Sequence, residues 1–493
     1  AMGRDALQAN TTASGNTAIG HSSLYANTTG TENTALGANA LDANTTANSN
    51  TAVGYSSLGA NTTGTLNVAL GKDALRDNTT ASTNTAIGTV SMRLNTTGAS
   101  NTAVGYGTLD TNTTGGSNVA IGRDSLTANT TASANTAVGY NAGASNTTGG
   151  LTAFGYRAAY SNTTGNTQSA FGTDALYFTT TGADNSAFGA FALKANTTGA
   201  NNTAVGYNSL TANTTGTQGT AVGRNAGAAN TTGNYNTFIG DGSGDANTTG
   251  ASNTAIGQDS LGANTTGATN TALGRNALLA NTTVDNNTAV GYSTLSANTT
   301  GTGNSAVGRS ALGANTTGSG NVAFGAYWVG NVNAAMAVNT TGGSNSAFGA
   351  GALAANTTGA NNVCVGLAAG DAITTGGGNI ILGRGADTDA TTNFATVIGY
   401  NVTGVANYTT LGTGANDIRA QHGTATWATV SDQRYKKDIV DSTAGLSFIN
   451  ALQPRTFKYK TLGELPETFR AYEADSTEVF KSSQTQHGFI AQE

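Results

Sequence analysis

Residues 27–43 read NTTGTENTALGANALDA, and this 17-residue pattern returns along most of the chain. The repeats carry a tripeptide of the form Ala–apolar–Gly, with Ala in 20 of 24 cases, and its 24 glycines run from Gly3 to Gly399. Of the 23 intervals between them, twenty are 17 residues long, two are 16 and one is 24. So regular a spacing indicates a solenoid, in which every repeat is one structural coil.

The length of the repeat selects the fold class. Seventeen residues are too few for a helix–turn–helix repeat, which needs about 33. They suit two short strands, one at NTAVG and one at SLxANTT, joined by turns rich in Gly and Asn. We therefore expect an all-β solenoid (a β-roll) of about 24 coils over residues 1–399, with Asn and Thr stacked in hydrogen-bonded ladders.

Composition restricts the function classes. Charged residues make up 9% of the 493 residues and aromatics 6%, with 69 Gly and only 2 Pro. Such a chain is typical of a repetitive extracellular or virion protein, and its periodic apolar residues argue against disorder. The sequence offers no motif for a cofactor, no metal-ligand spacing and no basic domain for nucleic acid. It also has no apolar run long enough for a membrane span.

A coil of this size presents only three or four small apolar side chains to its interior. So thin a column has little core to offset the cost of ordering the chain, and association would supply more. The units NTAIG (16–20), NTAVG (50–54) and NSAVG (304–308) resemble the head repeats of trimeric autotransporter adhesins. That resemblance implies a homotrimer.

The composition changes after Gly399. Residues 400–493 hold 19 of the 46 charged residues and both prolines. We expect a neck or linker at 400–430 and a separate domain at 431–493. The motifs SDQRYKKDI (431–439), LQPRTFKYK (452–460) and HGFIAQE (487–493) resemble the endosialidase-type intramolecular chaperone of phage tail fibres and spikes.

The resemblance implies a maturation reaction. Such domains trimerise the fibre and are then released by cleavage before the serine of the first motif, here the Val430–Ser431 bond. Ser431 would be the nucleophile, Lys436 its activating base, and His487 an orienting group or proton carrier. A lysine serves as a base only where burial or a nearby cation lowers its pKa. The family continues beyond this sequence, so a partial α+β domain is expected, and catalysis is limited to one self-cleavage.

The residue after the repeat Gly is a candidate contact surface. It is Tyr in seven coils and Arg or Lys in seven others, and the main candidates among them are Tyr55, Tyr106, Tyr207, Arg123, Arg224 and Arg275. Tyr and Arg suit contacts with glycans or acidic polymers of a host surface. A solvated stripe that keeps the rod soluble is the alternative. The single 24-residue interval adds Tyr327 and Trp328, either as a receptor-contact loop or as a loop packed on the coil.

The sequence therefore predicts a trimeric fibre shaft for attachment to a host surface, located on a virion tail or phage-like particle outside the cell. A bacterial surface adhesin and an ice-binding solenoid are the alternatives. The segment GDGSGD (240–245) has a weak likeness to a calcium-binding turn, but it occurs once, so no metal site is expected.

Overall fold

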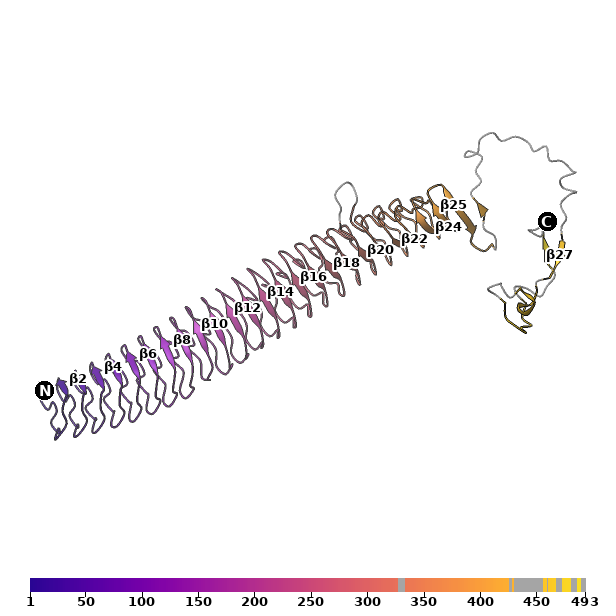
Figure 1. Ribbon diagram of the computed structural model, residues 1–493. Helices are drawn as coiled ribbons and strands as arrows, with labels where there is room; N and C mark the ends of the chain where they lie inside the picture. The colour runs from indigo at the N-terminus through magenta and orange to yellow at the C-terminus, as the bar shows by residue number, and fades with distance from the viewer. Residues whose placement is uncertain are drawn as a thin grey trace. The chain divides into compact units, whose positions relative to one another are not determined.

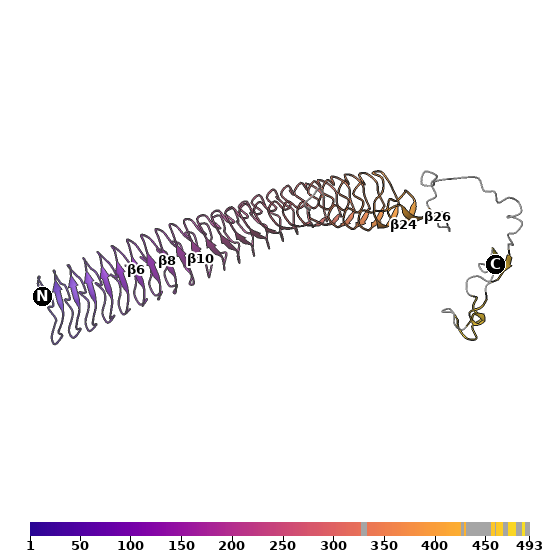
Figure 2. The same cartoon turned by 45° about the horizontal axis from the view of Figure 1, so that its top comes forward.

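The computed structural model describes residues 1–326, 333–424, 428–429, 455–458, 460–466, 472–479 and 486–488. Two compact units divide the chain, Ala1–Thr429 and Val430–Glu493. The first unit is the repeat region, and Figures 1 and 2 show its strands stacked in chain order along a gently twisted solenoid. The predicted all-β solenoid is confirmed.

Each coil contributes one strand of mostly three residues, formed by the Thr-Ala-apolar part of the repeat. The strands are β1 Thr17–Ile19, β2 Thr34–Leu36, β3 Thr51–Val53, β4 Val68–Leu70, β5 Thr85–Ile87, β6 Thr102–Val104, β7 Val119–Ile121, β8 Thr136–Val138, β9 Thr152–Phe154, β10 Ser169–Phe171, β11 Ser186–Phe188, β12 Thr203–Val205, β13 Thr220–Val222, β14 Thr237–Ile239, β15 Thr254–Ile256, β16 Thr271–Leu273, β17 Thr288–Val290, β18 Ser305–Val307, β19 Val322–Phe324, β20 Ser346–Phe348, β21 Val363–Val365, β22 Ile380–Leu382 and β23 Thr396–Tyr400.

These strands form one parallel sheet in which every repeat lies on the equivalent residues of the next. Thr17 pairs with Thr34, Ala18 with Ala35 and Ile19 with Leu36, and the same register holds along the ladder. The 16- and 24-residue intervals keep this register because their length differences fall between strands. With a strand spacing of about 4.8 Å, 23 coils give a rod roughly 110 Å long.

The prediction of a second strand in each coil is wrong, because each coil from β1 to β22 contains one strand. The residues two and four places after the repeat Gly take left-handed backbone angles, as at Asn39 (φ 58°) and Leu41 (φ 51°), and a strand cannot contain them. The coil instead closes through a turn whose backbone bonds still reach the next coil, as from Leu41 N to Ser57 O (3.0 Å). This conformation costs a leucine about 1–2 kcal/mol. Full burial of its side chain, stabilising by roughly 1.5–3 kcal/mol, offsets that cost.

The repeat glycine is required by the approach of neighbouring coils. At Gly37 φ is 141°, and a Cβ there would lie 2.4 Å from the carbonyl oxygen of Gly54 in the next coil. Since no side chain fits such a gap and few residues adopt such a φ, each coil needs a glycine at the end of its strand.

The interior of a coil is small and partly polar. In the coil of β2 the side chains of Ala35, Ala40 and Leu41 are fully buried, together with Asn33 and Asn44. This matches the three or four apolar side chains expected. Cys364 takes the position of the strand alanine and is also fully buried.

Two asparagine ladders run through the solenoid, one from each buried Asn position. In the NTT corner, Asn44 Nδ2 donates to Asn27 Oδ1 of the preceding coil (2.9 Å) and to Ala47 O (3.1 Å). Before the strand, Asn50 Nδ2 donates to Gly64 O (2.9 Å), and its backbone N donates to Asn33 Oδ1 (3.0 Å). The predicted Asn ladders are confirmed, and they satisfy polar groups that burial would otherwise leave unpaired.

Threonines also stack, through carbonyl groups. Thr28 Oγ1 donates to Thr45 O (3.0 Å), and Thr45 Oγ1 donates to Thr62 O (3.3 Å). The Thr ladder therefore joins each hydroxyl to the backbone of the next coil.

Within the neck or linker expected at 400–430, residues 400–424 and 428–429 continue the same sheet. Strand β24 (Tyr408–Thr413) pairs in parallel with β23, and β25 (Asn416–Gln421) returns antiparallel to β24. Strand β26 (Ala428–Thr429) pairs antiparallel with β25 and is the last of the 26 strands. An antiparallel hairpin thus covers the parallel edge at this end of the solenoid.

The second unit is described in short segments. Strand β27 (Arg455–Phe457) pairs antiparallel with β28 (Gln486–Gly488), and a 3₁₀ helix, η2, covers Leu462–Glu464. Glu464 Oε2 accepts hydrogen bonds from Thr461 N (2.9 Å) and Thr461 Oγ1 (3.1 Å). The α-helical part of the expected α+β domain stays a prediction, since the described residues of this unit contain no α-helix.

Candidate functional site

One edge of the solenoid presents the residue that follows each repeat glycine; we call this row the Tyr–Arg edge. Its tyrosines are 40–53% exposed, and they are Tyr55, Tyr106, Tyr140, Tyr156, Tyr207, Tyr292 and Tyr400. The parallel register places them above one another, separated by whole coils. The candidates Tyr55, Tyr106 and Tyr207 are thus solvent-accessible side chains on one edge.

Guanidinium groups stack on these rings where Arg and Tyr occupy consecutive coils. Arg123 lies 5.5 Å from the ring centroid of Tyr106 and 5.9 Å from that of Tyr140. Arg309 over Tyr292 (5.5 Å) and Arg384 over Tyr400 (5.8 Å) repeat the arrangement. Such cation–π contacts hold both side chains in place, so the edge is a partly ordered surface.

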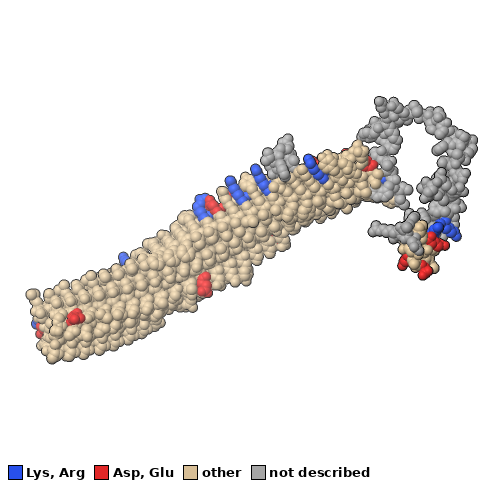
Figure 3. Space-filling view, in the orientation of Figure 1, with Lys and Arg blue, Asp and Glu red and all other residues tan. Residues whose placement is uncertain are grey.

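The other basic candidates lie on the same edge. Arg224 Nη2 is 2.8 Å from Asp241 Oδ2 in the next coil, and its guanidinium pKa is raised by that hydrogen bond. Arg275 is exposed. Figure 3 shows Lys and Arg side chains in a row along one edge of the solenoid, while most of the visible surface carries no charge.

Aromatic side chains are densest between Tyr140 and Tyr207. Tyr140 and Tyr156 stack at 5.5 Å between centroids, and Tyr160 and Tyr177 at 5.1 Å. The guanidinium of Arg157 lies 4.7 Å from Tyr156 and 4.8 Å from Tyr177, while it pairs with the buried carboxylate of Asp174 (2.9 Å). This patch combines planar aromatic faces with polar donors.

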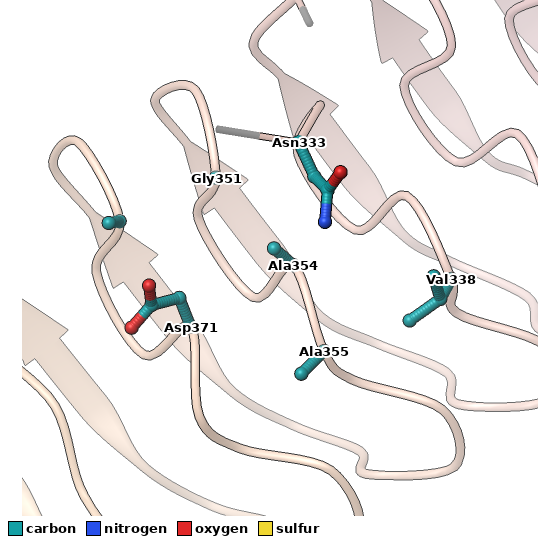
Figure 4. A pocket seen from close by; sticks show the side chains of 7 residues that line it. Asn333, Val338, Gly351, Ala354, Ala355 and Asp371 are labelled. Carbon is teal, nitrogen blue, oxygen red and sulfur yellow. The ribbon is translucent and has the colours of Figure 1, made fainter. Parts of the chain in front are cut away.

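The candidates Tyr327 and Trp328 lie outside the described residues. A pocket of 380 Å³ crosses three coils at the 24-residue interval between Gly325 and Gly349. It is lined by Asn333, Val338, Gly351, Ala354, Ala355, Ala368 and Asp371. Figure 4 shows the amide of Asn333 and the carboxyl of Asp371 at its two ends, with short alanine side chains between them. The small side chains hollow this part of the surface.

A carboxyl pair adjoins the pocket. Asp387 Oδ2 accepts a hydrogen bond from Ala372 N (3.0 Å) and Oδ1 accepts one from Thr388 N (2.8 Å), while its side chain also bonds to that of Asp371. Burial and the bond with Asp371 raise the pKa of Asp387 to about 7. No sequence motif indicates this pair, because Asp371 and Asp387 are neighbours only through the stacking of coils.

No cluster of three or more His, Cys, Asp or Glu suited to a metal ion occurs among the described residues. The segment 240–245 has a packing role instead. Gly244 takes the place of the buried leucine of other coils, and the ring of Phe238 fills the space.

In the second unit, the structure brings two of the three chaperone-like motifs together. Thr456 of the second motif pairs with His487 of the third across strands β27 and β28. The catalytic candidates Ser431 and Lys436 lie outside the described residues, as does Val430 of the predicted cleavage bond. Their roles, and that of the His487 side chain, stay predictions.

Comparison with known families agrees with the sequence motifs. Residues 431–493 match the family described as chaperone of endosialidase. No curated protein and no solved structure matches the chain. The chain is therefore a repeat β-solenoid followed by a segment, residues 431–493, that is similar to the chaperone of endosialidase. Within the described residues, no helix has the length and apolarity to cross a membrane.

The outward-facing apolar row of the sheet was not predicted from the sequence. The third residue of every strand from β1 to β23 is Val, Ile, Leu or Phe. The signal was present in the repeat consensus, but only the observed single strand shows that this side chain points away from the coil interior.

Proposed function

We propose that this chain is the shaft of a homotrimeric fibre that attaches a phage or phage-like particle to a host surface. The observation that carries the proposal is the chaperone-family match at residues 431–493, which begins two residues after the last strand of the solenoid sheet. A long rod built from similar stacked coils suits a spacer that projects a contact surface, and the Tyr–Arg edge supplies side chains for glycan contact.

The chaperone segment would trimerise the chains and then leave by self-cleavage. Ser431 Oγ attacks the Val430 carbonyl carbon while Lys436, in its neutral form, accepts the hydroxyl proton. Lys436 then protonates the departing Ser431 nitrogen, so the Val430–Ser431 amide becomes an ester. Water hydrolyses the ester, which leaves a carboxylate on Val430 and restores the Ser431 hydroxyl. The boundary of the two compact units between Thr429 and Val430 supports this site, because a cut there would leave the hairpin of β24 and β25 with the solenoid.

The test is to express the full-length protein with a complete chaperone domain, together with its Ser431→Ala variant, and to measure native mass and intact chain mass. We expect a trimer of shortened chains for the wild type and a trimer of uncut chains for Ser431→Ala. Lys436→Ala should match Ser431→Ala in the mass of its chain. A stable monomer that is uncut in all three proteins would overturn the proposal.

A further inference from the structure

The outward face of the solenoid sheet carries an unbroken apolar row, which we call the outer stripe: the third residue of each strand β1–β22, and Ile398 in β23. Its side chains lie at the surface, with Leu36 44% exposed, Phe188 42% and Val365 41%. The strand residue between the two outward ones is buried in every coil, so the sheet is covered on its inner side only.

The outer stripe holds no charge. The other outward residue of each strand is Thr, Ser, Val or Ile, so neither outward position is ionisable from β1 to β22. By contrast, the Tyr–Arg edge, two residues further along the chain in each coil, holds seven basic residues. An apolar centre beside a polar and aromatic margin is the arrangement found in protein–protein interfaces.

Stacked phenyl rings widen the stripe at two places. Phe154, Phe171 and Phe188 stack in consecutive coils at 5.1 and 4.8 Å between centroids, and Phe324 stacks on Phe348 at 5.3 Å. The rings remain exposed or half-buried although each contacts the next. Parallel sheets are nearly always covered on both faces, so an open face of this length calls for a second layer.

The exposed area suffices for stable association. Of the 23 stripe side chains, 13 are 36–45% exposed and ten are half-buried. Together they present on the order of 1,000 Å² per chain, against ~800 Å² per partner in a standard interface. Uncovered apolar patches of this size are unusual on proteins that remain monomeric.

We propose that the outer stripe is the surface through which copies of this chain associate, facing the common axis of the assembly. This inference rests on the proposed function, which supplies the homotrimer. Around a threefold axis parallel to the solenoid, each residue meets its own copies. A charged residue there would meet the same charge on the other copies, and the stripe accordingly contains no ionisable residue. Only a copy repeats its apolar contacts at the same coil spacing along the whole rod.

The test compares two positions of one coil in the full chain, Val205 on the outer stripe (37% exposed) and Tyr207 on the Tyr–Arg edge (50% exposed). We expect Val205→Cys to form interchain disulfides under mild oxidation, and Tyr207→Cys to form few or none. The native Cys364 is fully buried and serves as the silent background. A second comparison uses lysine. The double variant Val205→Lys/Val222→Lys should sediment as a monomer, while Tyr207→Lys should still sediment as a trimer. Circular dichroism of each variant verifies that the coils remain folded.

The outcomes separate the two proposals. A wild-type trimer in which Val205→Cys fails to cross-link and the double Lys variant stays trimeric would overturn the stripe assignment and leave the proposed function standing. A folded wild-type monomer would overturn both. In that case, thermal hysteresis in the monomer would assign the outward Thr and aliphatic rows to ordered water.

Discussion

The ring of Phe238 occupies the space that Gly244 leaves in the same coil and that Gly227 leaves in the preceding coil. A Cβ on Gly244 would lie 2.4 Å from Cδ1 of the phenyl ring, and one on Gly227 would lie 2.7 Å from Cδ2. Phe238 stands where other coils have the strand alanine, whereas the two glycines stand where they have the buried leucine. Three departures from the consensus therefore form one compensated packing unit.

This unit predicts strong coupling between its members. Phe238→Ala alone should destabilise the surrounding coils by about 3–5 kcal/mol, because it leaves a cavity against two glycines. Adding Gly227→Leu and Gly244→Leu should recover most of that loss. Leucine suits both sites, since φ is 59° at Gly227 and 57° at Gly244, close to the 48° of Leu210. Hydrogen exchange of coils β13 to β15 measures the effect. The double variant Gly227→Leu/Gly244→Leu, which keeps Phe238, is the control and should fail to pack. Additive effects would contradict the coupling.

The repeat period was enough to predict the solenoid, the in-register stacking and the Asn ladders, because a fixed 17-residue spacing leaves equivalent residues no other neighbours. The conformation inside a coil was harder to predict. Leu41 and Ala43 alternate as strand residues do, and nothing in the letters shows that Leu41 adopts a left-handed φ. Contacts such as that between Asp371 and Asp387 also cannot be predicted from the linear sequence, because they depend on which residues of successive coils meet.

A break in one asparagine ladder offers a stabilising substitution. Thr179 stands where the NTT corner has Asn, and Asn162 Oδ1 is buried with no hydrogen-bond partner among the described residues. Asn196 Nδ2 reaches Thr179 Oγ1 only at 3.4 Å. We expect the asparagine side chain of Thr179→Asn to hydrogen-bond to both neighbouring Asn side chains. The opening free energy of these coils, measured by hydrogen exchange, should then rise by about 1 kcal/mol. Thr181→Asn, at an exposed position two residues away, should change nothing. Equal exchange in both variants would argue against the ladder as a source of stability.

The repeat glycines should tolerate no side chain. Gly206 has φ 131°, and a Cβ there would lie 2.4 Å from Gly223 O, so Gly206→Ala combines backbone strain with a collision between coils. Gly303 also has a positive φ, 65°, but a Cβ there would meet no atom within 4 Å. We expect Gly303→Ala to cost about 1 kcal/mol and Gly206→Ala about 3 kcal/mol or more, measured as local opening by hydrogen exchange. Similar costs at both sites would show that coil spacing does not select glycine.

The pKa of Asp387 predicts that the last coils lose stability as the pH rises. Folding raises this pKa from 3.8 to about 7, mainly through burial, so the folded carboxyl holds its proton where the unfolded one has lost it. The stability is therefore fully present below about pH 4 and is lost progressively as the pH rises through about 7. Asp387→Asn cannot ionise, so hydrogen exchange around β22 and β23 should lose this pH dependence, after correction for the intrinsic rate. Glu32→Gln, at an exposed site near the opposite end of the solenoid, should retain the wild-type profile in β22 and β23. If Asp387→Asn kept that profile as well, the dependence would have to arise from another group, since the Asp387 carboxyl would no longer be there to titrate.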